Sequence, residues 1–553
     1  MQKYFLKLLI LVAFVSFQTN LFAQDTLGRY LNIVTGQFHP TVMDAAKLNE
    51  NPSVNDSTQK LPIKGYNINS KKINTGFDVA PITPVQLQGE PLTKLYNALV
   101  KLGFGNYTTP YGEVWYNSLR SKEYAYGIRM KHLSSSYTAQ DYGFAGYSDN
   151  EISLSGKKFL KEHTLSGNFD YARNVVHFYG YDANLNNLDK DLTVQRFNYF
   201  AANADLMSHY TKAERYNHEV KLSYYNLADL YKTSENNIKA NGFVQTTIDK
   251  EILKVNADID YYNLKTAKDT INNTIITLNP NFYATGEKYK AAVGVTAVMD
   301  NLEGTKFYFY PKIDLSYNVV DNIIIPYVGA SGGLHKNSMK SITDENPFVL
   351  SQLTLKNTND RYKLFGGIKG TITSKINYNA CASYTSIDNL MMYVNDTKDL
   401  LANRFDVVYD QAQELNVRGE VAYQLREKIR FNLSGDYYNY KMTNELRAWY
   451  IPQVKITLAG NYNLSDKIII KVDLFYLDNQ YARTIENKDM KDEKFVATQL
   501  KPMFDANLGG EYRYNKKLGF FINLNNVGNV RYYRYINYPT QRFGFMLGLS
   551  YSF

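Results

Sequence analysis

The chain has 553 residues, of which 44% are hydrophobic, and its formal net charge is +9 at pH 7. A mean hydropathy of −0.40 excludes a bundle of long apolar membrane helices, and no basic stripe or motif of a nucleic-acid-binding protein accompanies the charge. The single cysteine, Cys381, excludes an intramolecular disulfide and a cysteine-rich metal site, so we interpret it as a small packing residue.

Residues 1–23 have the pattern of a secretory signal peptide. Lys3 and Lys7 provide the positive start, and the apolar run over residues 8–15 is too short to span a bilayer as a helix. We expect cleavage after Ala23. Export without a helical anchor leaves the periplasm, the outer membrane or the exterior as destinations.

Residues 24–96 differ in composition from the rest of the chain, because they hold six of its 14 prolines. Proline lacks the N–H that a central strand donates, so this segment is not expected to join a sheet. A short helix is expected over residues 41–48. We interpret residues 24–96 as an N-terminal arm that is either extended in the periplasm or inserted into a pore.

From residue 97 to residue 553 the dominant pattern is a period of two. Apolar and polar side chains alternate over residues 253–261 and 415–424, and more loosely over residues 468–476. Alternation of this kind places one face of a strand against an apolar surrounding and the other against water. Runs of about ten to fourteen residues are long enough to cross a membrane at a tilt, whereas strands of soluble sandwiches are usually shorter.

Short polar turns recur along this region and set the expected number of strands. With one long loop between successive turns, ten turns join about 22 strands in an up-and-down barrel, with both chain ends on the side of the short turns. The fold class we predict is therefore all-β, a closed transmembrane antiparallel β-barrel. The turns are expected near Arg120, Lys161, Lys212, Asp249, Glu287, Asp321, Ser374, Glu427, Asp466 and Lys516, and the long connections near residues 135–149, 174–190, 336–358, 389–410 and 480–503.

The last strand shows the alternation most clearly. Its intervening residues are small or polar except for Met546, so one face suits lipid and the other a wet lumen. The residues expected to form the lipid face and the membrane-insertion signal are Phe543, Phe545, Leu547, Leu549, Tyr551 and Phe553.

The end of the chain resembles that of a TonB-dependent receptor barrel. The resemblance rests on residues 524–533, 537–539 and 548–553, and the closing Phe553 resembles the signal read by the outer-membrane assembly machinery. Residues 103–111 resemble barrel-only relatives in Bacteroidota. The resemblance implies 22 strands, a place in the outer membrane and passage of a solute. The chain departs from the family because only residues 24–96 precede the barrel, where such receptors carry a globular plug, and no clear TonB-contacting box is present.

The polar residues give no strong signal for chemistry. None of the seven histidines stands at a metal-ligand spacing from another, and the aspartates between residues 388 and 410 lack the fixed spacing of a calcium loop. Residues 132–136, His-Leu-Ser-Ser-Ser, contain a base and nucleophiles, but spacing alone cannot bring them within hydrogen-bond reach of a third group. We therefore expect no enzyme, no catalytic or metal residues and no cofactor.

Two functions remain open from the sequence. The first is a receptor-like barrel that binds or passes a solute across the outer membrane. The second is a plugless structural or assembly subunit of an outer-membrane protein complex. The partners expected are the lipid bilayer and lipopolysaccharide, the outer-membrane assembly machinery, and TonB or another outer-membrane protein; nucleic acid is not expected.

Overall fold

The structure is a computed structural model that describes residues 96–184, 188–210, 215–399, 401–425, 428–465, 467–486 and 494–553. The predicted leader (residues 1–23) and, apart from Tyr96, the predicted arm (residues 24–96) lie outside the described residues. The described chain is mainly β-strand, with one α-helix, α2 (Met339–Glu345), and one 3₁₀ helix, η1 (Lys190–Leu192). Neither helix has the length and apolar character needed to span a membrane.

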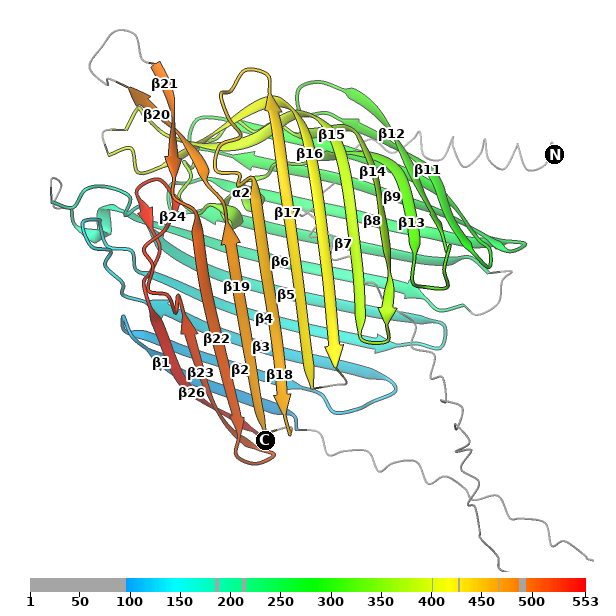
Figure 1. Cartoon of the computed structure of the whole chain (residues 1–553), viewed down its shortest axis with the longest axis horizontal. Helices are drawn as coiled ribbons and strands as arrows, with labels where there is room; N and C mark the ends of the chain where they lie inside the picture. The colour runs from blue at the N-terminus through cyan, green and yellow to red at the C-terminus, as the bar shows by residue number, and fades with distance from the viewer. Residues whose placement is uncertain are drawn as a thin grey trace, which may run out of the picture. The chain divides into compact units, whose positions relative to one another are not determined.

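Twenty-two strands form one closed antiparallel sheet, because each pairs with the next and the last pairs with the first (Figure 1). The predicted fold class is confirmed. The strands are β1 (Ala98–Gly105), β2 (Thr109–Asn117), β3 (Tyr124–Ser135), β4 (Tyr147–Phe159), β5 (His163–His177), β6 (Val194–Ser208), β7 (Asn217–Asp229), β8 (Ser234–Ile248), β9 (Glu251–Lys265), β10 (Thr270–Thr285), β11 (Tyr289–Asp300), β12 (Lys306–Tyr317), β13 (Ile325–His335), β14 (Thr358–Thr373), β15 (Ile376–Asn395), β16 (Phe405–Leu425), β17 (Ile429–Met442), β18 (Val454–Leu464), β19 (Ile468–Leu477), β22 (Met503–Arg513), β23 (Leu518–Asn525) and β26 (Gly544–Ser552).

The ten short turns predicted from the sequence join strands that pair in the structure. Seven of the ten turn residues lie in the short connections between those strands. Lys212, Glu427 and Asp466 lie outside the described residues, but the strands on either side of each are hydrogen-bonded to one another. Short turns of outer-membrane barrels face the periplasm and long loops face outward. We name the two ends of the barrel the periplasmic end and the outer end accordingly.

One predicted loop is wrong in its length. Residues 389–410 were expected to be a long connection, but β15 and β16 continue through most of that stretch and leave only residues 396–404 between them. The ladder continues because these two strands pair with each other beyond a register shift between Ile387 and Leu390.

Two small hairpins lie in the long connections at the outer end. They are formed by β20 (Gln480–Glu486) with β21 (Lys494–Leu500), and by β24 (Tyr533–Tyr535) with β25 (Tyr538–Pro539).

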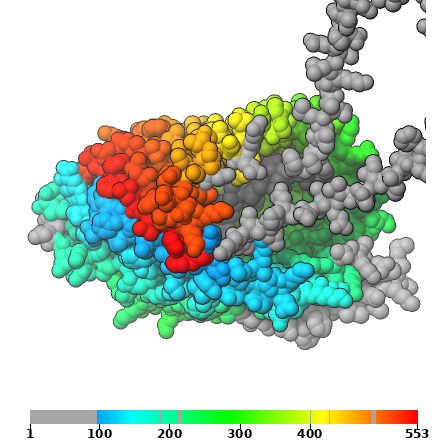
Figure 2. Space-filling model, turned by 90° about the horizontal axis from the view of Figure 1, so that it is seen from below, coloured from blue at the N-terminus to red at the C-terminus, as the bar shows by residue number. Residues whose placement is uncertain are grey.

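Alternation along the strands separates an apolar outer surface from a polar inner one, and Figure 2, viewed from below, shows the strands enclosing a hollow. Leu102, Met130, Leu222 and Val328 are among many large apolar side chains that are exposed on the outer surface. Lipid would satisfy these side chains, whereas water would not. The closed barrel with an apolar outside is an outer-membrane structure.

The barrel closes where β1 meets β26, in register from Leu99 opposite Ser552 to Gly105 opposite Met546. Gly103 and Gly548 lie directly opposite each other in this ladder. A Cβ atom at Gly548 would collide with the Phe521 ring and the Leu102 carbonyl, so only glycine fits there. The Phe521 ring in turn meets the Tyr111 ring edge to face, with centroids 6.0 Å apart, and the two rings cover the closure from inside.

The ladder between β12 and β13 is the shortest in the barrel. These strands pair only over Ile313–Ser316 and Tyr327–Ala330, although β11 and β12 pair along the whole of β12. Pro311 lies just beyond the paired stretch and has no N–H to donate to a neighbouring strand. The outer halves of β12 and β13 form no backbone ladder, and Tyr308 and Tyr310 pack in one cluster with Leu334 there.

The two faces of β9 can be tested by substitution. Val255 lies between Val244 and Pro280 on the outer face, while Asn256 faces the lumen and donates to the Asn279 side chain at 3.3 Å. We expect Val255→Arg to lower the free energy of unfolding in lipid by about 2–4 kcal/mol, because it puts a charge into hydrocarbon. Asn256→Arg should cost clearly less, since water reaches that side. Equal losses in urea-induced unfolding in vesicles would show that the faces are assigned wrongly.

Candidate functional site: the folded loops at the outer end

A hydrophobic core lies at the outer end of the barrel, made by loops that meet one another and the strand ends. The loop of residues 336–357, which contains α2, is central to it: Met339, Ile342 and Val349 are fully buried. These side chains belong to one cluster with wall residues and with residues of the other loops. The cluster members from elsewhere include Phe197, Leu227, Tyr262, Leu264, Met392, Tyr393, Phe405, Trp449, Tyr450, Ala482, Leu500, Tyr535 and Tyr538. We call residues 336–357 the lid loop.

The helix of the lid loop is held at its N-terminus by a wall residue. Ser338 caps α2, with its hydroxyl accepting from the Ser341 N–H and the Ser341 hydroxyl accepting in return from the Ser338 N–H. The fully buried Glu235 of β8 accepts from the Met339 N–H at 2.6 Å and from the Tyr225 hydroxyl at 2.5 Å. A carboxylate at this position is stabilised by the unpaired N–H groups and positive dipole end of the helix.

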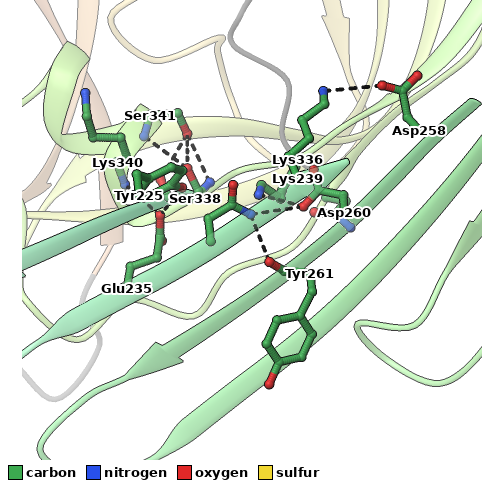
Figure 3. A network of polar contacts seen from close by, with 12 residues as sticks. Tyr225, Glu235, Lys239, Asp258, Asp260, Tyr261, Lys336, Ser338, Lys340 and Ser341 are labelled. Carbon is green, nitrogen blue, oxygen red and sulfur yellow. Dashed lines mark hydrogen bonds and ion pairs between the residues drawn. The ribbon is translucent and has the colours of Figure 1, made fainter. Parts of the chain in front are cut away.

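A second wall contact lies just before the helix and is an ion pair that is almost fully buried (Figure 3). Lys336 Nζ lies 2.9 Å from Asp260 Oδ1 of β9, with 1% and 8% of the two side chains exposed. The same ammonium lies 4.8 Å from the centroid of the Tyr262 ring, and the Asn237 amide donates to Asp260 at 3.3 Å. Burial lowers the pKa of Lys336, and the carboxylates of Asp260 and Glu235 oppose that change.

The opposite side of the lid loop is fixed by tyrosines from β15 and from the β24–β25 hairpin. The Tyr393 hydroxyl donates to Glu345 Oε2 at 3.1 Å, and the Tyr535 hydroxyl donates to the Glu345 carbonyl at 3.3 Å. The centroids of the Phe348 and Tyr538 rings lie 4.2 Å apart, and the Tyr538 hydroxyl donates to the Asn403 carbonyl. The lid loop is thus attached on both sides of the barrel, and it packs across the outer end.

Below the lid loop the wall of the lumen is polar and carries several ion pairs. Arg129 lies 2.9 Å from both Glu113 and Glu151, and Lys131 lies 3.0 Å from Glu151. Between β16 and β17, Arg418 Nη1 lies 3.3 Å from Asp436 Oδ1. Such a surface suits a hydrated solute and does not select strongly for one sign of charge.

The six residues expected to form the lipid face of the last strand lie around β26. Phe543, Phe545, Leu547, Leu549 and Phe553 are exposed, and Tyr551 is half-buried with its ring 4.8 Å from that of Phe553. The Phe553 N–H donates to the Ala98 carbonyl, and its carbonyl accepts from the Asn97 N–H. Their role in membrane insertion stays a prediction.

Other residues considered in the sequence have structural partners. Asp410 accepts from the N–H groups of Asn444 and Glu445, and so supports a loop instead of offering oxygens to calcium. His163 and His218 come together with centroids 5.3 Å apart, a pair that spacing did not indicate. Within the described ranges no group of three or more His, Cys, Asp or Glu residues could hold a metal ion. Cys381 is a free thiol on β15.

Comparison with known proteins shows the fold only. No protein-family model matches the chain, and no curated protein matches its sequence. The ferripyoverdine receptor of Pseudomonas aeruginosa matches in structure with a TM-score of 0.63 at 12% identity, over 84% of this chain and 72% of the receptor. The ferric enterobactin receptor PfeA of the same organism has a TM-score of 0.61 at 12% identity, over 83% and 80% of the two chains.

The ferric-catecholate import receptor Fiu of Escherichia coli also matches, with a TM-score of 0.59 at 11% identity over 83% of this chain and 82% of Fiu. The barrel of this chain therefore has the fold of siderophore-receptor barrels. At the level of fold, this agrees with the resemblance to TonB-dependent receptors found in the sequence. These matching structures are receptors, not enzymes.

The buried ion pair of the lid loop can be tested by removing one partner. Lys336→Met leaves the Asp260 carboxylate buried without its cation, which typically costs about 3–5 kcal/mol. We expect faster hydrogen exchange over residues 337–349 with unchanged exchange in the barrel strands. The control Lys340→Ala removes a partly exposed pair with Asp344 and a cation–π contact with the Tyr199 ring, and it should cost about 1 kcal/mol. Equal exchange in both variants would contradict a fastening role for Lys336.

Proposed function

We propose that this chain is a gated outer-membrane barrel of the TonB-dependent-receptor type, which binds or passes a solute through its polar lumen. The observation that carries the proposal is the combination of a 22-stranded barrel, a polar inner wall and a lid loop packed across the outer end. A barrel of this width without an obstruction would leave a wide aqueous channel. The lid loop is the part that would have to move for a solute to enter from outside.

The receptors that match in fold are named for ferric siderophore ligands or import, which favours uptake over export for this chain. Their sequence identity to this chain is too low to assign it the same ligand. We infer the solute class from the polar inner wall, which suits a hydrated molecule of either charge. TonB is the energy-transducing partner that this proposal implies, and lipopolysaccharide and the bilayer are its surroundings.

The alternative is a structural or assembly subunit whose barrel holds another outer-membrane protein. Buried contacts fix the lid loop on both sides. This observation favours the alternative, because a permanent closure would be fixed in the same way. The two functions differ in whether the outer end opens, and that difference can be measured.

Single-channel conductance in planar bilayers separates the two functions. We expect the mature chain to pass little current, and Lys336→Met to open to a large conductance because the lid loop is released. Lys340→Ala should behave like the unaltered chain. A variant without residues 24–96 tests whether the arm also obstructs the lumen. Closure of all of these forms would overturn the gated barrel and support the structural subunit, which affinity purification from outer membranes would then have to show with a partner.

The terminal phenylalanine is proposed to be read by the assembly machinery. Phe553→Ala keeps both backbone bonds to the start of β1 and removes an exposed ring, so the stability of the folded barrel should barely change. We expect the yield of heat-modifiable barrel in outer membranes to fall several-fold. Phe520→Ala, which removes an exposed ring from β23, is the matched control and should keep its yield. Equal barrel yields for Phe553→Ala and Phe520→Ala would contradict a recognition role for Phe553.

A further inference from the structure

Three polar side chains meet on the outer surface of the barrel, near the outer ends of β3 and β4. Asn150 Oδ1 lies 2.7 Å from His132 Nδ1, and Ser134 Oγ lies 3.2 Å from His132 Nε2. His132 and Asn150 are directly opposite each other in the ladder, and Ser134 is two residues further along β3. A nucleophile, a base and a group that orients the base are thus in hydrogen-bond contact in the order that acyl transfer requires.

The hydrogen bonds around Asn150 determine which nitrogen of His132 carries the proton. The Asn150 amide nitrogen donates to the Ser148 hydroxyl at 3.2 Å and to the Arg173 carbonyl at 3.3 Å, so its oxygen is turned toward His132. An amide oxygen only accepts, and therefore His132 Nδ1 is the protonated nitrogen. His132 Nε2 is left with a lone pair, and the Ser134 hydroxyl donates to it. This is the tautomer in which a histidine can take a proton from serine.

The depth of the three residues in the barrel wall indicates the substrate. On the same face, the next row toward the periplasmic end is Met130, Ile152 and Tyr171, all exposed to the outside. The row at His132 and Asn150 is the first polar one, and Arg173 lies opposite Asn150 in it. On these three strands the row thus marks the upper edge of the apolar surface, where the ester groups of outer-leaflet lipids lie above their acyl chains.

The three side chains are accessible from the membrane, and the receptor fold does not exclude chemistry at this site. His132, Ser134 and Asn150 are each partly exposed, so a molecule in the membrane interface reaches them without passing the lid loop. The site lies on the outside of the wall, whereas the paired charges of Arg129 and Glu151 on the alternate residues face the lumen. A receptor fold does not determine the chemistry of a site on its surface, because unrelated activities recur on one fold.

We propose that Ser134 and His132 are the catalytic residues of an esterase site that cleaves an acyl ester of an amphiphile in the outer leaflet, with Asn150 as a positioning residue. The Ser134 oxygen attacks the ester carbonyl carbon while its proton passes to His132 Nε2. The intermediate collapses, the bond to the alcohol oxygen breaks, and the alcohol leaves with that proton. Water, deprotonated by His132, then attacks the acyl-serine, and the carboxylic acid is released with Ser134 restored.

A fluorophosphonate carrying a fluorescent tag tests the nucleophile directly on the full mature chain in detergent. The Ser134 oxygen would form a bond to phosphorus, fluoride would leave, and the serine proton would pass to His132. We expect labelling at Ser134, located by mass spectrometry, that is lost in Ser134→Ala and reduced in His132→Ala by about 10²–10⁴-fold. Ser136→Ala, a neighbouring serine outside the contact, is the matched control and should be labelled like the unaltered chain.

Hydrolysis of p-nitrophenyl palmitate in micelles and fatty-acid release from dioleoylphosphatidylcholine vesicles test the reaction. Release from vesicles assigns the ester to a membrane lipid, and hydrolysis of the nitrophenyl ester alone assigns it to a free amphiphile. Asn150→Ala should lower the rate, and Asn150→Asp should restore it with an altered pH profile, because a carboxylate also accepts from Nδ1. A merely structural asparagine would move neither the rate nor the profile.

Heat-modifiability of every variant shows whether the barrel has folded, so that loss of labelling is not mistaken for loss of structure. The proposal is overturned if the folded, unaltered chain shows neither labelling at Ser134 nor hydrolysis above the level of Ser134→Ala. It is also overturned if labelling occurs at another serine. The conductance measurements are independent of this outcome, because the site lies outside the lumen.

Discussion

The structure depends on one constraint: in hydrocarbon, a backbone N–H or C=O group has no water to bond and must find its partner within the protein. A sheet satisfies that constraint only if it has no free edge, and this chain removes the edge by pairing β26 with β1. The closure itself demands special residues. Gly103 and Gly548 face each other there, and the Phe521 ring occupies the space that a side chain would otherwise fill.

Closing a ring of this size creates a second problem, because its polar interior would be open to water at both ends. At the outer end, loops pack into a hydrophobic core that covers the lumen, a feature more typical of a soluble domain. The lid loop fits this core because the charged groups that it buries near the wall have partners: Glu235 binds the helix N-terminus, and Lys336 binds Asp260. A buried charge without its partner would be strongly destabilising.

The period-two pattern was sufficient to predict the barrel, its strand number and its ten turns, because each depends on residues close together in sequence. The lid loop was not predicted, since its core joins residues as far apart as Phe197, Ile342 and Tyr538. The expected loop over residues 389–410 was wrong for a related reason: residues 390–395 continue the ladder with residues 405–410, and Met392, Tyr393 and Val394 pack into the same core. Likewise, residues 132–136 could be noticed in sequence, but only strand register brings Asn150 to His132.

The short ladder between β12 and β13 has a mechanical consequence. The lid loop begins directly after β13, so a pull on the loop is transmitted first to the strand that is least tied to its neighbour. Separating β13 from β12 would break few backbone bonds, whereas separating it from β14, or β15 from β16, would break a ladder that runs along most of the strands. The lid loop therefore leaves the barrel wall beside the place where neighbouring strands share the fewest backbone bonds.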